Sequence, residues 1–424
     1  MAVSEAIPRG HRQVRYFAAI GEDALAWVEG LARDAGLRRV PTPRAASLLL
    51  IAGRLPERSW PALRRVHDQM PHPRAVLHWG EGAQPVPDAV ALAPAATPAV
   101  AMRALQGDLD RGARGSSPDL LPNEPPAPWL GKGPHGQGGE GMMGGTPYGR
   151  PMTMRGDELR DGLRLDAHAV TLGPFAPMLP PGLALDLRLQ GDVIQRVEVM
   201  QPPFRDAMVE APFAAAIDRP MSAAGLERAR AVHHLRCLGR FCALRGAAAP
   251  AARAYASAYR ATIGGRVDLG SLRRWLWLSG LRPGIAPGLG TLSAAQRGCL
   301  SGPALRAAGV PDDLRTRLEP YTGVGFAPIA RQAGDVRARI DQWLAEAAQA
   351  LDLAARLEGL PPTTFAEGLE GPAGALGAPA GGDRGDRPAL DLDALLRGLE
   401  WGQAVSVLAS FSPDALRRML GAAG

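Results

Sequence analysis

The chain has 424 residues, with 48 Lys and Arg against 42 Asp and Glu and a net charge of +6, and this length suggests two or three domains. Arg is interleaved with Asp and Glu, and no basic run with interleaved aromatic residues occurs, so nucleic-acid binding is not expected. The three scattered cysteines argue against a disulfide framework and favour a reducing compartment. No apolar run is long enough to cross a bilayer, and the N-terminal segment lacks the apolar core of a secretory signal.

Residues 1–105 are predicted to form an α/β domain with an open, mostly parallel sheet. The apolar stretches 14–20 and 47–53 are typical of buried parallel strands, and each is followed by a segment with apolar residues at helical spacing. The second of these helices is expected to begin near Ser59, a capping residue, with Pro61 in its first turn. Two further short strands complete an alternation that favours a sheet covered by helices.

Residues 106–155 are predicted to be a linker, because Gly and Pro are too frequent there for a packed core. Lys132 is followed by Gly-Pro rather than by Ser or Thr entering a helix, so a phosphate-binding loop is not expected. His135 with Met142 and Met143 would suit copper, but a flexible segment is the simpler interpretation.

Residues 156–358 are predicted to form an α+β domain with a β-hairpin and a dominant helical bundle. Alternation of apolar and polar residues over 163–199 predicts the hairpin, and the pattern is helical from residue 221 onward. The clearest helix, 334–357, carries an apolar stripe wide enough to need burial against other helices. The stripe consists of Val336, Ile340, Trp343, Leu344, Ala347, Leu351 and Ala354.

The last part of the chain is predicted to contain a linker and a tail. Residues 359–389 are rich in Gly and Pro and are expected to form a second linker. Residues 390–424 have apolar residues at helical spacing and are expected to form a C-terminal helical tail that docks on a neighbour.

A specific motif lies at 300–321, LSGPALRAAGVPDDLRTRLEPY, and is followed by GDVRARIDQWLAEAAQAL. These segments resemble the quinone-cavity subunit of respiratory complex I, which is related to the large subunit of nickel–iron hydrogenases. The family pattern combines Gly-Pro-x-Leu-Arg-Ala-Ser-Gly-Val, Asp-Leu-Arg, Pro-Tyr and Gly-Asp. The matching residues include Gly302, Pro303, Arg306, Gly309, Asp313, Arg315, Tyr321 and Asp335. The resemblance covers most of residues 163–357 and implies the fold of that subunit.

The N-terminal domain resembles the neighbouring complex I subunit, which carries the terminal 4Fe–4S cluster and corresponds to the hydrogenase small subunit. The resemblance rests on the strand at 47–53 and on the run Leu-Arg-Arg-x-x-Asp-Gln-Met-Pro at 63–71. The chain therefore resembles a fusion of two partner subunits through a Gly-rich linker. In the family these two proteins clasp each other, and the quinone headgroup lies between them.

The ligands of the iron–sulfur cluster are missing from this chain. Four cysteine thiolates hold such a cluster, and the resemblance places them at Ala18, Ala19, Gly82 and Ala96. Residues 1–105 contain no cysteine. The sequence therefore predicts a relative that has lost this cluster.

Ligands for quinone and for nickel are also missing. The family has two histidines in its hairpin, and the corresponding positions are near Ala176 and Pro181. A hydrogenase needs two Cys-x-x-Cys pairs, whereas Cys237 and Cys242 are spaced Cys-x4-Cys and Cys299 stands alone. We expect Cys237 and Cys242 to be buried packing residues. No catalytic, cofactor-binding or metal-ligating residue is predicted, and neither quinone nor NAD is supported.

The histidines and the charged motif residues are expected to have structural roles. His233 and His234 are adjacent on a helix, so their side chains diverge. His67, His72 and His78 are expected at the surface or its rim, and no Ser-His-Asp constellation is recognised. A buried turn rich in Arg and Asp is unfavourable unless every charge is paired. We therefore hypothesise that Arg306, Asp313 and Arg315 form a paired knot. Its bidentate contacts would lock the loop against the following helix.

The resemblance and the missing ligands together imply a cofactor-free peripheral subunit of a complex I-like or energy-converting-hydrogenase-like membrane complex. It is expected at the cytoplasmic, inner face of the cytoplasmic membrane, on antiporter-like proton-channel subunits, with a structural or coupling role and no catalysis of its own. An acidic protein is a further expected partner, because the chain carries a small positive charge.

Two alternatives remain open at the level of the sequence. In the first alternative, the chain is an active oxidoreductase subunit of the NADH:quinone oxidoreductase or hydrogenase class. It handles quinone through a remodelled cavity and takes electrons from a partner. In the other alternative, it is a soluble regulatory or assembly protein that mimics the real pair of subunits.

Overall fold

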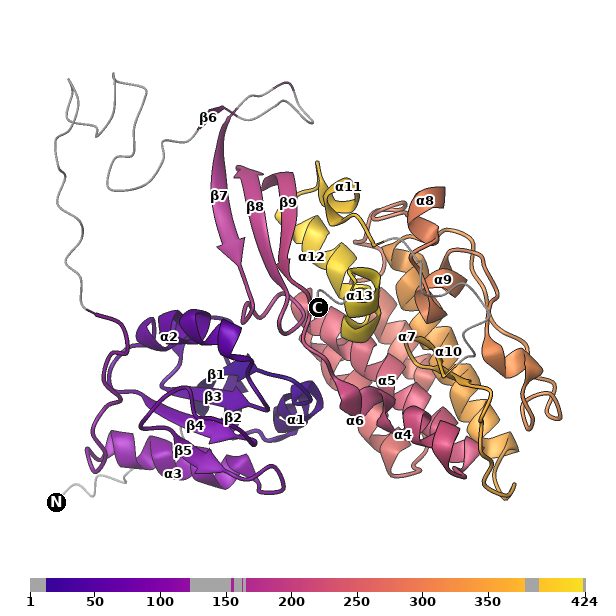
Figure 1. Cartoon of the computed structure of the whole chain (residues 1–424), viewed down its shortest axis with the longest axis horizontal. Helices are drawn as coiled ribbons and strands as arrows, with labels where there is room; N and C mark the ends of the chain where they lie inside the picture. Colours follow the sequence, from indigo (N-terminus) through magenta and orange to yellow (C-terminus); the bar gives the residue numbers. More distant parts are fainter. Residues whose placement is uncertain (1–12, 123–153, 156–161, 163–164, 378–388, 422–424) are drawn as a thin grey trace, which may run out of the picture. The chain divides into compact units, whose positions relative to one another are not determined.

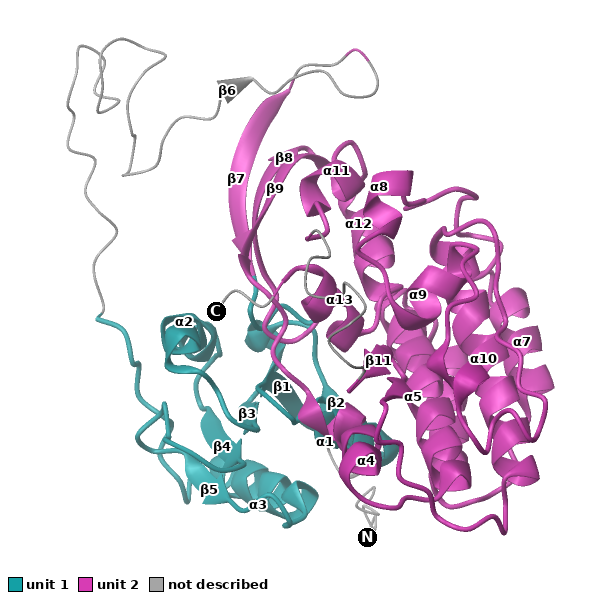
Figure 2. Cartoon of the chain, turned by 45° about the vertical axis from the view of Figure 1, so that its right-hand side comes forward, with its two compact units in different colours: residues 1–155, 173–177 teal, residues 156–172, 178–424 magenta. Residues whose placement is uncertain are grey.

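The computed structural model describes residues 13–122, 154–155, 162, 165–377 and 389–421. The chain divides into two compact units, which Figure 2 shows in different colours. Unit 1 comprises residues 1–155 and 173–177, and unit 2 comprises residues 156–172 and 178–424.

Unit 1 contains a five-stranded sheet in which every pair of neighbouring strands is parallel, in the order β2-β1-β3-β4-β5. The strands are β1 (Val14–Ile20), β2 (Leu37–Arg39), β3 (Leu48–Ala52), β4 (Ala75–Trp79) and β5 (Val90–Leu92). Every residue of β3 and β4 is buried, as expected for central strands that are covered on both faces. This confirms the predicted parallel α/β fold of the N-terminal part.

Three α-helices cover this sheet: α1 (Leu25–Gly30), α2 (Trp60–Asp68) and α3 (Pro98–Asp110). Short 3-10 turns lie at Leu31–Arg33, Pro43–Ala45 and Glu57–Ser59. Figure 1 shows α2 on one side of the sheet and α3 on the other. One core includes Leu50 and Leu77 from the strands together with Met102 and Leu105 from α3. Helix α3 continues to Asp110, so the folded part of unit 1 reaches into the predicted linker.

The short strand β6 (Met154–Arg155) ends the first stretch of unit 1. Unit 2 begins with three strands in the order β7-β8-β9, which are β7 (Asp166–Leu172), β8 (Ala184–Gln190) and β9 (Val193–Gln201). Strands β7, β8 and β9 are antiparallel neighbours. The turn Gly191–Asp192 joins β8 to β9, as the alternating pattern predicted, and Leu185 and Leu187 lie on the buried face of β8.

The rest of unit 2 is mainly helical. Its helices are α4 (Ala207–Asp218), α5 (Ala223–Leu244), α6 (Ala248–Thr262), α7 (Leu269–Leu278), α8 (Ala294–Arg297), α9 (Gly302–Ala307), α10 (Val336–Arg356), α11 (Leu392–Leu396), α12 (Trp401–Ala409) and α13 (Pro413–Met419). A 3-10 helix, η5 (Leu314–Arg317), follows α9. The long helices α5 and α10 pack against each other, and α5 also packs against α6. The apolar stripe predicted for α10 is buried except at Leu351, which is half-buried.

The segment predicted as a second linker, 359–389, contains a buried β-hairpin. Strands β10 (Leu369–Gly371) and β11 (Gly374–Leu376) pair antiparallel, and Leu369 is fully buried. The glycines that suggested a linker serve close packing instead. A Cβ atom at Gly374 would lie 2.8 Å from the Ser301 hydroxyl, and the φ of Gly374 is +128°. The linker prediction is therefore wrong for this part of the segment.

The C-terminal tail packs within its own unit rather than on a neighbour. The Ile194 amide donates to the Leu399 carbonyl at 2.9 Å, and the Trp401 amide donates to the Asp192 carbonyl at 2.7 Å. The carboxylate of Asp393 accepts from the Val197 amide at 2.7 Å. These bonds attach α11 and the start of α12 to β9, which corrects the expectation of a tail that docks elsewhere.

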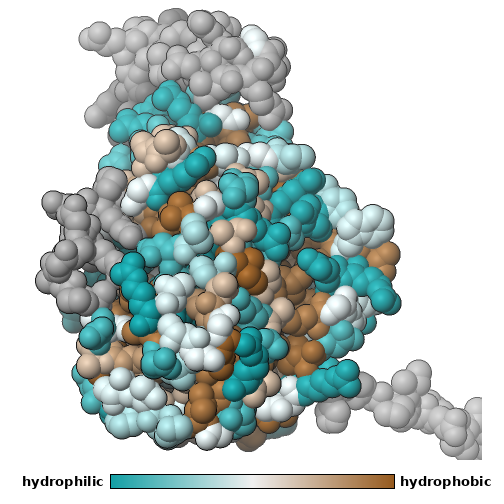
Figure 3. Space-filling view, turned by 90° about the vertical axis from the view of Figure 1, so that its right-hand side faces the viewer, coloured by the Kyte–Doolittle hydropathy of each residue, from teal (hydrophilic) through white to brown (hydrophobic). Residues whose placement is uncertain are grey.

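Within the described residues, the structure contains no helix that is both long enough and apolar enough to cross a bilayer. The face of the chain shown in Figure 3 carries hydrophobic residues interspersed among hydrophilic ones. Several large apolar side chains are nevertheless exposed, and Trp277 in α7, at 65%, is among the most exposed of them.

Candidate functional site

Seven charged side chains meet in the interior of unit 2, and we call them the buried ion cluster. Its carboxylates are Glu227, Asp313, Glu346 and Glu370, and its guanidinium groups are Arg230, Arg306 and Arg315. Their side chains are at most 4% exposed. They come from α5, α9, η5, α10 and β10, so the cluster joins elements that are distant in sequence.

Arg306 on α9 is the most connected member of the cluster. Its Nε donates to Glu346 Oε1 at 2.7 Å and its Nη2 donates to Glu346 Oε2 at 2.9 Å, which is a bidentate contact with α10. Its Nη1 lies 3.0 Å from a carboxylate oxygen of Glu370 and 3.2 Å from one of Asp313. One guanidinium group therefore binds three carboxylates at once.

Arg315 continues the cluster toward α5. It makes a bidentate contact with Asp313, through Nε to Oδ1 at 3.0 Å and Nη2 to Oδ2 at 2.6 Å. Its Nη1 donates to Glu227 Oε2 at 2.9 Å. Glu227 also accepts from Arg230 at 3.2 Å, and Arg230 Nη1 donates to the carbonyl of Gly371 at 3.0 Å.

Two titratable side chains border the cluster. The Tyr321 hydroxyl donates to Glu227 Oε1 at 2.9 Å, and His234 Nε2 lies 3.3 Å from Glu346 Oε2. Burial, together with the negative charge of Glu227, raises the pKa of Tyr321 well above its usual value. Burial lowers the pKa of His234 more than its contact with Glu346 raises it, so this imidazole is neutral at pH 7.

The electrostatic balance of the cluster is uneven, because four carboxylates face three guanidinium groups. Burial would raise the pKa of Glu346, but the charge of Arg306 overcomes burial and holds this pKa well below its usual range. Burial raises the pKa of Glu370, and Arg306 offsets only part of that rise. Burial therefore favours the protonated form of Glu370 more than water does.

The remaining motif residues shape the backbone around the cluster. Gly302 has a φ of +56°, and a Cβ atom there would lie 2.8 Å from the Ala373 carbonyl carbon. Pro303 lies in the first turn of α9. Gly309 has a φ of +99°. Asp335 caps α10, since its carboxylate accepts from the amides of Ala338 at 2.8 Å and Gly288 at 2.9 Å.

The hypothesised knot agrees with this geometry, because Arg306 and Arg315 both contact Asp313. Sequence reasoning missed the partners on other elements. A signal existed for Glu346, which is a charged residue among the apolar positions of α10. For Glu370 the glycine-rich surroundings pointed to a linker and concealed a buried carboxylate.

The positions that correspond to the lost iron–sulfur ligands offer no atoms that bind a metal. Ala18 and Ala19 are buried in β1, and Gly82 and Ala96 lie in the loops after β4 and β5. Alanine and glycine side chains have no atom that binds iron, so an iron–sulfur cluster does not fit these residues. All three cysteines, at 237, 242 and 299, are buried in unit 2.

Unit 1 contains a Ser-His-Asp arrangement that the sequence did not indicate. His67 Nδ1 lies 2.7 Å from Asp68 Oδ1, and His67 Nε2 lies 3.0 Å from the Ser117 hydroxyl. The same hydroxyl donates to Asp88 at 2.8 Å. His67 is fully buried and Ser117 is 1% exposed, so a substrate has no access to the hydroxyl.

The role of this arrangement is to hold residues 113–122 onto the unit. The Asp68 carboxylate accepts from the amides of Leu120 at 3.1 Å and Leu121 at 2.8 Å. The expected surface position is wrong for His67 and also for His78, which is 3% exposed in β4. Both are buried because they lie on elements that the sheet and its helices cover; His72 is exposed, as expected.

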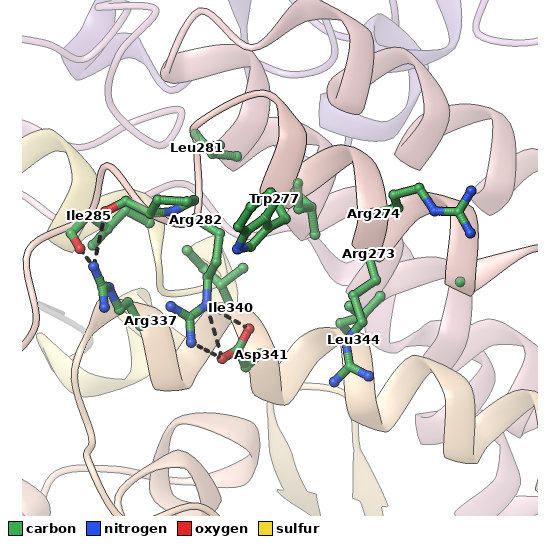
Figure 4. Close-up of a pocket in the computed structure, with 13 residues that line it drawn as sticks. Arg273, Arg274, Trp277, Leu281, Arg282, Ile285, Arg337, Ile340, Asp341 and Leu344 are labelled. Atoms are coloured by element: carbon green, nitrogen blue, oxygen red, sulfur yellow. Dashed lines mark hydrogen bonds and ion pairs between the residues drawn. The ribbon is translucent and has the colours of Figure 1, made fainter.

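A second candidate site is a cavity of about 870 Å³ between α7 and the N-terminal half of α10 (Figure 4). Arginines and apolar side chains line it together. Arg282 forms an ion pair with Asp341, with Nη2 and Oδ2 2.7 Å apart. This cavity is formed by residues of unit 2 alone and does not include any member of the buried ion cluster.

No protein-family model matches this chain. Among solved structures, it is similar to a chain in a structure of the membrane-bound sulfane sulfur reductase, an archaeal respiratory membrane complex. The two chains are 16% identical with a TM-score of 0.37, and the match covers 59% of this chain and 98% of the other.

Proposed function

We propose that this chain is a cofactor-free peripheral subunit of a membrane complex related to respiratory complex I or to energy-converting hydrogenases. In this proposal it binds antiporter-like proton-channel subunits at the inner face of the cytoplasmic membrane. Its role there is structural or coupling: it caps the membrane part or transmits its movements, and it carries no electrons. The sequence resemblance at 300–339 is the starting point of this proposal.

The observation that carries the proposal is the use of the motif's charged residues inside the fold. Arg306, Asp313 and Arg315 bind one another and carboxylates on α5 and α10, and each of the three side chains is at most 1% exposed. Buried ion pairs of this kind hold elements in one register, and breaking them is strongly destabilising. A motif that is committed to internal pairing supports a scaffold role.

The lost ligands are consistent with the absence of electron transfer. The positions that correspond to cluster thiolates are Ala18, Ala19, Gly82 and Ala96. The hairpin positions near Ala176 and Pro181 offer no imidazole for a quinone headgroup. A subunit with these residues retains the architecture of an electron carrier and supplies no donor atoms for it.

The proposal is tested by purifying the affinity-tagged full chain from the membranes of its native host in mild detergent. We expect multi-span antiporter-like subunits to be recovered with it, and we expect iron and nickel well below one per chain by elemental analysis. In inverted membrane vesicles, deletion of the chain should abolish ion translocation, whereas a chain carrying the exposed substitution Arg317→Ala should restore it.

Other outcomes separate the alternatives. Stoichiometric iron in the purified chain, or quinone reduction that requires it, would favour the active oxidoreductase subunit. Recovery of the chain without any membrane subunit would favour the soluble regulatory or assembly protein. Either result would overturn the scaffold proposal.

A further inference from the structure

The cavity between α7 and α10 has an excess of positive charge. Arg273 and Arg274 on α7, Arg282 in the following loop and Arg337 on α10 all line it, against the single lining carboxylate of Asp341. Asp341 is paired with Arg282. Arg337 donates to the carbonyl of Pro283 at 3.0 Å and has no carboxylate partner among the described residues.

Arg273 and Arg274 are exposed and have no ion pair or hydrogen bond within the described part of the chain. Figure 4 shows the Arg273 side chain extending toward Leu344, the Arg274 side chain extending away from it, and the Trp277 indole beside Arg282. Two unpaired guanidinium groups at a concave surface attract an anionic group, and planar guanidinium groups suit phosphate or carboxylate oxygens.

The other lining side chains are apolar. Leu276, Leu281, Ile285 and Ile340 are all at most 7% exposed and form the interior side of the cavity. Trp277, at 65% exposed, leaves a large apolar surface at the mouth. A ligand with a hydrophobic body would cover this surface, which a simple inorganic anion would leave in water.

A smaller cavity of about 160 Å³ extends the large one along α10. It shares Gly270, Arg273 and Leu344 with the large cavity and is otherwise lined by Leu269, Ala345 and Ala348. Arg273 is its only charged lining residue. The charged region thus adjoins an apolar extension, and the larger cavity by itself has the size of a small-molecule site, which is about 300–1,000 Å³.

We propose that this cavity binds an anionic amphiphile, whose phosphate or carboxylate group contacts Arg273, with Arg274 adding to the positive potential at the rim, and whose apolar part lies against Trp277 and Leu344. The ligand is either an anionic membrane lipid or a soluble amphiphilic phosphate, since both have this chemistry. The inference uses residues outside the buried ion cluster and does not depend on the proposed function.

Binding of monomeric, short-chain dihexanoyl phosphatidic acid to the purified full chain by isothermal titration calorimetry tests the proposal. We expect one site per chain, and we expect Arg273→Gln/Arg274→Gln to weaken binding about tenfold or more, because charge-assisted hydrogen bonds are lost. The matched control is Arg188→Gln/Arg205→Gln, which removes the same charge from two exposed arginines outside the cavity and should leave binding unchanged.

Trp277→Ala separates the apolar part of the ligand from its charge. It should weaken phosphatidic acid binding and leave the weak binding of inorganic phosphate unchanged. All three variants alter exposed side chains, so an unchanged melting temperature is expected and verifies that each one is folded.

Vesicle sedimentation identifies the source of the ligand. Binding to phosphatidylglycerol vesicles that Arg273→Gln/Arg274→Gln abolishes, with no binding to phosphatidylcholine vesicles, supports a membrane lipid. Binding of the monomeric lipid alone supports a soluble amphiphile. The proposal is overturned if no probe binds, if inorganic phosphate binds as tightly as phosphatidic acid, or if the control variant weakens binding equally. Preferential binding of polyglutamate would instead indicate an acidic protein and would also overturn it.

Discussion

Arg306 shows how one residue can hold several elements together. Its guanidinium group contacts three buried carboxylates, from Asp313 before η5, Glu346 on α10 and Glu370 on β10. Taking so many charges out of water is unfavourable, and pairing recovers much of that free energy only while every partner is present. The stability of unit 2 therefore depends strongly on this single side chain.

Arg306→Ala should lower the free energy of unfolding of unit 2 by about 3–5 kcal/mol, because it leaves Glu346, Glu370 and Asp313 buried without their common partner. Urea denaturation followed by circular dichroism measures the change. Arg317→Ala is the matched control, because Arg317 lies in η5, the 3-10 helix that follows α9, and is exposed; it should change stability by less than about 0.5 kcal/mol. An unchanged unfolding midpoint for Arg306→Ala would contradict the assigned role.

Asp414 is a second residue whose burial has a measurable consequence. It lies in the first turn of α13 and is 7% exposed. Burial, and then the negative charges of Asp206 and Glu210, raise the pKa of Asp414 to about 7, although Arg240 and Arg418 oppose these effects. The folded chain thus keeps a proton at this carboxyl at pH values where the unfolded chain releases it.

A carboxyl with a raised pKa in the folded state makes the free energy of unfolding fall as pH rises from about 4 to about 7. Asp414→Asn mimics the protonated form and should remove this fall. The variant should match the parent near pH 4 and exceed it near pH 8 by up to about 4 kcal/mol, as measured by urea unfolding at both pH values. The exposed substitution Asp352→Asn should show no such pH-dependent gain. Equal destabilisation by Asp414→Asn at both pH values would refute the assignment.

At the scale of elements, the contact between α9 and the β10–β11 hairpin places Arg306 opposite Glu370. It requires glycine at 302, where the backbone is left-handed and the Ala373–Gly374 peptide lies against the Cα atom. The Ser301 hydroxyl also donates to the Ala373 carbonyl at 3.0 Å. This close approach explains why the motif begins with Gly-Pro.

Gly302→Ala should lower the melting temperature of unit 2 markedly, because the new methyl group meets backbone atoms at 2.8 Å and the φ of +56° strains a residue with a side chain. Differential scanning calorimetry measures the effect. Gly402→Ala in α12 is the control, since nothing lies within 4 Å of its added methyl group and alanine favours a helix. Equal melting temperatures for the two variants would show that the contact is not needed.

Elements were predictable where one local period dominated. The run at 47–53 became the buried strand β3, and the stripe of α10 became its buried face. The β10–β11 hairpin was missed because its glycines occur in both linkers and tightly packed turns. The pairing of Ser117 with His67 was missed because 50 residues separate them and no local pattern links the two positions.

At the scale of the whole molecule, the chain divides into two compact units. The core of unit 1 is built on a parallel sheet, and unit 2 has a core around Tyr321, Leu353 and Leu369. The composition change at the Gly-rich stretch after residue 105 indicated that two bodies exist. Their content agrees with the predicted α/β and α+β classes, and the proposed subunit role and the amphiphile site both fall on unit 2.

The sequence by itself determined the alternation of strands and helices, the apolar face of α10 and the lack of thiol donors in the first 105 residues, because each is a local or compositional property. Only the tertiary structure decided which charges meet. Arg306 pairs with Glu346 and Glu370, which are 40 and 64 positions away. Such pairing depends on how helices and strands pack, because a buried charge needs an opposite charge beside it. No local period in the sequence encodes which residues meet in this way.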